Sequence, residues 1–248
     1  MASAYEISLA DLAVVFIPLV ITIVIYIRWV TDWRTPVLAS LRMLAQLLLI
    51  GFFLKFIFEA GSALTAVLVL SVMVGVAAWI ALRPLAGMRR RLYIKTLAAL
   101  ILGGGPVLAL VVLGVVRLSP WYLPRYLIPL AGMIFANGMN SISLCAERMC
   151  SEMDHGRDLE QARSFAYRAG LLPLTNSFFA VGLVSIPGMM TGQILSGISP
   201  LLAARYQIMV MCMLMGACGI SAAVFLYLVR PEIQERFDGQ NTASVCAE

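Results

Sequence analysis

The residues of this sequence that could do chemistry are polar side chains inside long apolar segments. The main candidates are Arg42, Gln46, Asn137, Asn140, Asn176 and the thioether of Met189, with Gln193 and Gln207 as further amides. Amide oxygens could bind a cation weakly in transit, a thioether suits a soft metal, and an arginine would favour an anion or a chelate. Each residue also has an ordinary role. Amides hydrogen-bond between membrane helices, methionine fills gaps in a bundle, and arginine can snorkel to the interface.

A second group of candidates lies in the only long hydrophilic stretch, Glu147 to Arg168, which mixes both signs of charge. Leu159, Ala162 and Ala166 recur there at helical spacing. The stretch could be a solvated connector helix, or it could dock a partner protein. For docking, the candidate contact residues are Glu147, Arg148, Glu160, Arg163 and Arg168.

Motifs of the common enzymes are not found in the sequence. The run Gly103–Pro106 lacks the Lys-Ser/Thr pair of a nucleotide-binding loop, and no Gly-x-Ser-x-Gly or His-Glu-x-x-His occurs. His155 is the one histidine and the five cysteines form no Cys-x-x-Cys, so a zinc site is not expected. We expect no cofactor and no catalytic activity, and any active transport must draw its energy from another subunit or an ion gradient.

The elements that must position these residues are membrane helices. The chain is 61% hydrophobic and only 12% charged, against roughly 25% charged in a soluble domain. A helix needs about 20 apolar residues to cross a bilayer, and seven such runs occur near 9–27, 37–58, 63–82, 96–116, 124–144, 170–187 and 201–229. The sequence therefore predicts an all-α, polytopic transmembrane bundle that forms one domain over 1–248 in the inner, cytoplasmic membrane.

Charge placement sets the expected topology. Arginine and lysine gather beside alternate connections, which by the positive-inside rule puts the N-terminus outside and the C-terminus in the cytoplasm. Residues 145–169 then form a cytoplasmic loop with a candidate coupling helix. The net charge of +5 lacks the clustered footprint of nucleic-acid binding. Glycine and proline around 103–106 predict a kink in the fourth run, and 188–199 is either a re-entrant segment or a plain loop.

Several stretches resemble the FetB/YbbM family of permeases. They are Val181 to Gly192 (VGLVSIPGMMTG), Gly197 to Pro200, Tyr206 to Val210, Ile128 to Met133, and the early-run residues Arg42, Gln46 and Gly51. The resemblance covers about 40 to 228. It implies the membrane subunit of an ABC transporter that works as a homodimer with a separate ATPase. Bacterial members are associated with iron export and plant relatives with aluminium tolerance, so it implies a metal ion as substrate, with a path between the second, fifth and sixth spans.

One departure from the family pattern leaves alternatives open. Family members carry a longer cytoplasmic loop with a Leu-Gly-Ala element, which is missing between Cys145 and Pro173 of this chain. An ATP-independent channel or secondary carrier is therefore a second hypothesis, although no buried carboxylate is available for a proton relay. A non-transporting interaction protein is a third.

Overall fold

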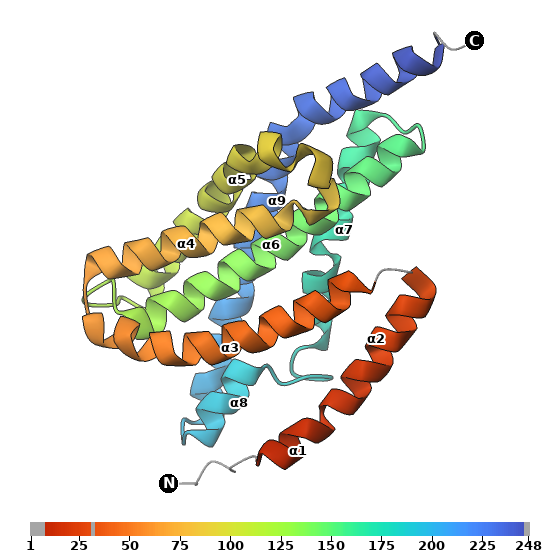
Figure 1. Ribbon diagram of the computed structural model, residues 1–248. Coiled ribbons are helices and arrows are strands. Elements are labelled where there is room, and N and C mark those ends of the chain that lie inside the picture. Colours follow the sequence, from red (N-terminus) through yellow and green to blue (C-terminus); the bar gives the residue numbers. More distant parts are fainter. Residues whose placement is uncertain (1–7, 31–32, 246–248) are drawn as a thin grey trace. The chain divides into compact units, whose positions relative to one another are not determined.

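The computed structural model describes residues 8–30 and 33–245, and these residues are helical almost throughout (Figure 1). This confirms the all-α fold class. By their internal contacts the described residues divide into two units, one before and one after the boundary at Gly61. The expectation of a single domain over 1–248 stays a prediction.

The N-terminal unit consists of three helices, α1 (Leu9–Val14), α2 (Phe16–Val30) and α3 (Arg34–Ala60). Ser8 begins α1 as its N-cap, where the side-chain oxygen accepts a hydrogen bond from the backbone N–H of Asp11 at 3.1 Å. In α2 no residue is buried within the structure. A helix that is apolar all round and exposes that surface is typical of a membrane span.

The C-terminal unit is a bundle in which the long helix α9 (Pro200–Val245) is central. It packs against α5 (Arg89–Ala109), α6 (Pro124–Asp154) and α7 (Leu159–Ala180). The helix α4 (Ala63–Ala81) lies beside α6 and also contacts α5 (Figure 1). Three shorter elements complete the unit: η1 (Arg83–Met88), the π-helical η2 (Leu110–Val115) and α8 (Gly188–Leu195), which packs on α9.

Small residues set how closely these helices approach. A Cβ atom at Gly103 of α5 would lie 2.3 Å from the hydroxyl of Ser221 on α9 and 2.4 Å from its backbone nitrogen. A Cβ atom at Gly170 of α7 would lie 2.3 Å from the sulfur of Cys145 and 2.8 Å from the carbonyl oxygen of Ser141, both on α6. Membrane helices associate through such close packing, because lipid is as apolar as their side chains.

Each of the seven predicted apolar runs overlaps one or two of the observed helices. Among the described residues, five helical stretches are long and apolar enough to cross a membrane: Asp11–Val30, Ala63–Ala81, Arg83–Val115, Pro124–Asp154 and Pro200–Arg236. The count of seven spans would add α3 and α7. That count and the outside location of the N-terminus stay predictions.

The structure adds detail to three segments, and at the end of the sixth run it differs from the sequence expectation. The backbone remains helical through Gly103–Pro106 and changes to π geometry only at Leu110. The sixth run ends at Ala180 instead of 187, because Gly182 takes a positive φ of 83° and its N–H bonds to the carbonyl of Ser185 in a tight turn. Residues 188–195 form the helix α8, whose eight residues are too short to span.

Candidate functional site

A polar stripe runs along the exposed face of α6. Its members recur at helical spacing: the half-buried Asn137 and Ser143 and the exposed Asn140 and Glu147. The buried face of the same helix carries Ile134, Ile142, Cys145 and Met149 instead. The amide of Asn137 donates from Nδ2 to the carbonyl oxygen of Met133 at 2.8 Å, which leaves its own carbonyl oxygen free to accept.

The contact between α6 and α7 sets the depth of the third predicted amide, Asn176. Gly170 lies against Ser141 and Cys145, so it is level with about residue 143 of α6. The two helices run antiparallel. Six residues further along α7 is Asn176, and six residues back along α6 is Asn137. Both amides therefore lie at a similar depth in the bundle, and Asn176 is exposed.

The remaining predicted path residues lie elsewhere. Arg42 and Gln46 are exposed on α3, in the N-terminal unit. Met189 is half-buried on α8 and packs against the hydrophobic core. The C-terminal unit thus brings Asn137 and Asn176 to a similar depth. That the six predicted path residues share one path stays a prediction. Within the described residues, no group of three or more His, Cys, Asp or Glu side chains could hold a metal ion.

The two further amides that the sequence pointed to, Gln193 and Gln207, each have a buried side-chain oxygen. Gln207 of α9 is 7% exposed, and its side-chain oxygen has no hydrogen-bond partner among the described residues. The side-chain oxygen of Gln193 on α8 is buried in the same way. Leaving a buried polar atom unpaired costs about 1–3 kcal/mol, so such a group in a native structure calls for a water, an ion or a ligand. The sequence marks both residues only as polar positions in apolar surroundings.

The predicted cytoplasmic stretch 145–169 forms most of a helical hairpin. It comprises the end of α6, a turn over 155–158 and the first half of α7. Asp158 begins α7 as its N-cap, and Oδ1 accepts a hydrogen bond from the N–H of Gln161 at 2.7 Å. The exposed Glu160 forms an ion pair with Arg163 one turn later and lies 3.8 Å from a guanidinium nitrogen of Arg230 on α9. The hairpin is therefore tied to the central helix.

A buried carboxylate that sequence reasoning missed organises the tip of this hairpin. The side chain of Glu152 is 7% exposed and forms ion pairs with Arg148 through Oε1 and with Arg157 through Oε2, the latter at 2.5 Å. Arg157 also stacks on the ring of Phe165 in α7, 4.7 Å from its centroid. The signal was present in the sequence, since helical periodicity places Glu152 on the same face as Cys145 and a buried carboxylate requires cations.

Further ion pairs join α5 to α9 at the same end of the unit. The ammonium group of Lys95 lies 2.5 Å from Glu232 and donates to the carbonyl oxygen of Leu228 at 2.6 Å. Arg91 contacts Glu235 at 2.5 Å, on the surface. In the part of the unit that is described, ion pairs therefore join α5 and α7 to α9 and hold the tip of α6. Figure 1 shows the α6–α7 turn beside the C-terminal half of α9.

The five residues predicted to contact a partner are all exposed on this hairpin. Arg148 and Arg163 are engaged in the ion pairs above, and Glu160 links two helices. Glu147 continues the polar stripe of α6, and Arg168 lies two residues before Gly170 on α7. The structure brings these residues to one end of the bundle and adds Glu152 and Arg157 to them.

Comparison with known proteins decides the family. The chain matches an uncharacterised protein family, UPF0014, over residues 8–233. The chain belongs to the UPF0014 family. This confirms the resemblance given above and makes the chain a multi-pass membrane protein. No solved structure matches it significantly.

Three UPF0014 relatives come from bacteria and plants. The chain is 33% identical to the probable iron export permease protein FetB of Escherichia coli, over 91% of this chain and 92% of that protein. It is 34% identical to the membrane protein STAR2 of rice, over 78% and 72% of the two chains. It is 32% identical to the protein ALUMINUM SENSITIVE 3 of Arabidopsis thaliana, over 77% and 74%.

Proposed function

We propose that this UPF0014 chain is the permease subunit of an exporter for a metal ion such as iron, and that a separate ABC ATPase drives it. The observation that carries the proposal is the polar stripe on the exposed face of α6. Asn137 and Asn140 belong to a stretch that is long and apolar enough to span a membrane. Lipid cannot hydrogen-bond with such side chains, so they are functional candidates by default.

The chemistry of the stripe suits a cation that passes through without being held. Asn137 has an accepting oxygen to spare, and Asn176 lies at about the same depth on the neighbouring helix. Amide oxygens are ligands for hard cations, but a pair of neutral amides binds more weakly than carboxylates do. Arg42, Gln46 and Met189 are proposed as further residues of the path, since an exposed cation, an amide and a thioether could each contact a passing ion or chelate. A second copy of the chain would close the path.

The charged hairpin is the proposed surface for the ATPase. Glu147, Arg148, Glu160, Arg163 and Arg168 are exposed there, and an ion pair between Glu160 and Arg230 joins the hairpin to α9. A movement imposed on the hairpin tip would be transmitted along α6 and α7 to the polar stripe, because tight contacts at Gly170 hold the two helices together. The printed name of the Escherichia coli relative supports iron as the cargo.

Replacing Asn137 by Leu tests the path. Efflux of radiolabelled iron from preloaded cells should fall up to about tenfold, because one ion–amide contact is worth about 1–1.5 kcal/mol. The amount of protein in the membrane should stay the same. Ala136→Leu is the matched control, since Ala136 is exposed on the adjacent position of α6 and has no polar group. Equal efflux from the wild type and from Asn137→Leu would show that Asn137 has only a packing role.

A further inference from the structure

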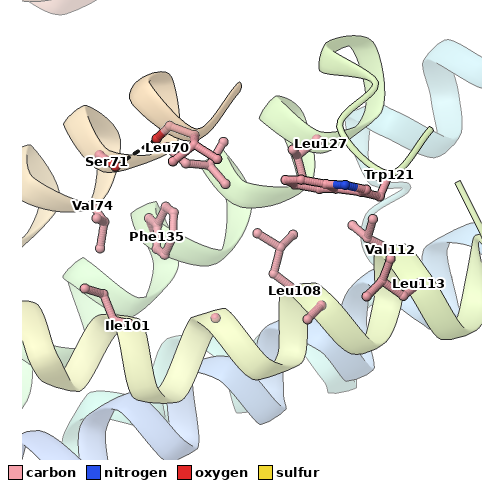
Figure 2. Close-up of a pocket in the computed structure, with 13 residues that line it drawn as sticks. Leu70, Ser71, Val74, Ile101, Leu108, Val112, Leu113, Trp121, Leu127 and Phe135 are labelled. Carbon is pink, nitrogen blue, oxygen red and sulfur yellow. Dashed lines mark hydrogen bonds between the residues drawn. The ribbon is translucent and has the colours of Figure 1, made fainter. Parts of the chain in front are cut away.

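The C-terminal unit contains an apolar cavity that the transport proposal does not use. It has a volume of about 540 Å³ and is lined by residues of α4, α5, η2 and α6, among them Leu70, Ile101, Gly105, Leu108 and Phe135. Figure 2 shows the side chains of Leu70, Ile101, Leu108 and Phe135 pointing from different sides into an open space. The volume lies within the range of ordinary ligand sites, about 300–1,000 Å³.

The walls of the cavity exclude a metal ion as its occupant. The hydroxyl of Ser71 already donates to the carbonyl oxygen of Val67 at 2.8 Å. The other lining side chains are hydrocarbon or aromatic. Because α4, α5 and α6 are all long and apolar enough to span a membrane, the cavity lies where acyl chains are the surrounding solvent.

One end of the cavity is marked by an aromatic side chain at the turn between η2 and α6. The indole of Trp121 lies across this end, close to Leu127 (Figure 2). Tryptophan concentrates at the level of lipid headgroups, where its ring is apolar and its N–H is wet. The cavity therefore extends from the interface toward the membrane interior.

Cationic residues lie near the same turn, two of them close to it along the chain. Arg117 and Arg125 each lie four residues from Trp121 along the chain, and both are exposed. Arg205 of α9 lines a smaller hollow together with Val115 and Val116, so it also approaches this turn. Within the described residues no ion pair is found for these three arginines. An anionic group at the mouth of the cavity would complement their charge.

We propose that this cavity holds an acyl chain of an anionic phospholipid, with its phosphate at the arginines around Trp121. Shape and charge provide the selectivity, because an acyl chain gains no hydrophobic free energy on leaving the bilayer for an apolar cavity. Each arginine near the surface favours an anionic headgroup by roughly fivefold in affinity. The proposed lipid site is distinct from the stripe of Asn137, Asn140 and Glu147. A test of lipid binding there is therefore independent of whether the chain exports a metal ion.

The test measures lipid retained by the full chain in native mass spectrometry, after purification and exposure to phosphatidylglycerol or phosphatidylcholine. We expect the wild type to retain phosphatidylglycerol in preference, by roughly tenfold or more. Gly105→Leu should weaken retention, because Gly105 lines the cavity, a Cβ there meets nothing within 4 Å, and the larger side chain would narrow the space for an acyl chain. Leu110→Phe is the control, since Leu110 is 65% exposed and does not line the cavity.

A second variant separates the headgroup from the chain. Replacing Arg117, Arg125 and Arg205 together by Gln should remove the preference for phosphatidylglycerol and leave a bound lipid of either kind. Equal retention by Gly105→Leu and the wild type would overturn the proposal, as would a wild type that retains neither lipid because protein covers the cavity. Equal retention of both lipids by the wild type would overturn the assignment of an anionic headgroup.

Discussion

Two glycines on one helix, Gly103 and Gly105, should respond in opposite ways to the same added methyl group. A Cβ at Gly103 would lie 2.4 Å from the backbone nitrogen of Ser221 and 2.6 Å from its Cα, whereas ordinary contact begins at 3.4 Å. The helices α5 and α9 must therefore separate by about 1 Å, the difference between 3.4 and 2.4 Å, at their most extensive interface. A Cβ at Gly105 meets nothing within 4 Å.

The magnitude follows from comparing the two variants. Both Gly→Ala changes gain the same helix propensity, up to about 1 kcal/mol, so this gain cancels between them. Overpacking a tight contact costs about 1–3 kcal/mol. Gly103→Ala should therefore be less stable than Gly105→Ala by about 1–3 kcal/mol, which corresponds to roughly 2–12 °C in Tm for a chain of this size.

The assay is thermal unfolding of each variant in detergent, followed by tryptophan fluorescence. Ser221→Gly should fail to rescue Gly103→Ala, because two of the three close atoms belong to the backbone of Ser221 and remain. A Gly103→Ala protein that melts together with Gly105→Ala, or above it, would refute the contact between α5 and α9. Full rescue by Ser221→Gly would show that only the hydroxyl is in the way.

Two further predictions concern the hairpin. Glu152→Gln should lower the free energy of unfolding, measured by chemical denaturation, by about 1–3 kcal/mol. Breaking a fully buried ion pair typically costs about 3–5 kcal/mol. The loss here should be smaller, because Arg148 and Arg157 are each about half exposed and their guanidinium groups can be solvated by water again. A loss no greater than that of Arg148→Gln alone would show that Glu152 does not join the two arginines. Asp158→Ala should lower the free energy of unfolding by about 0.5–2 kcal/mol and speed protease cleavage at the turn, because it removes the N-cap hydrogen bond from the N–H of Gln161. Asp158→Asn should retain most of the stability, because an amide oxygen can also accept this hydrogen bond. Equal cleavage of the wild type, Asp158→Ala and Asp158→Asn would rule out the cap.

The helices were predictable from the sequence because lipid imposes a simple rule. Every backbone polar group must be satisfied within the membrane, so each long apolar run becomes a helix. Helix ends outside the apolar runs follow different signals. The fifth apolar run was predicted to end at 144, but α6 continues to Asp154. Beyond the apolar run, ion pairs of Glu152 with Arg148 and Arg157 stabilise this end of the helix in place of lipid contact.

The candidate site was predicted in part. Periodicity placed Asn137 and Asn140 on one helix, but only the contact at Gly170 brings Asn176 to their depth. Glu152 was missed because a carboxylate in a hydrophilic stretch looks solvated until the opposing helix is known. The cavity beside Trp121 was also hidden, since it depends on how three apolar helices diverge, and apolar side chains carry no pattern that encodes this.

The central claim is that a separate ATPase drives metal export through this permease. The most direct measurement is uptake of radiolabelled Fe(II) by inside-out vesicles from cells that co-express the chain with its candidate ATPase. We predict uptake that requires ATP, is absent without either protein, and falls up to about tenfold in Asn137→Leu. Uptake that needs the permease but is unchanged without ATP or the ATPase would contradict the claim and support an ATP-independent channel or carrier.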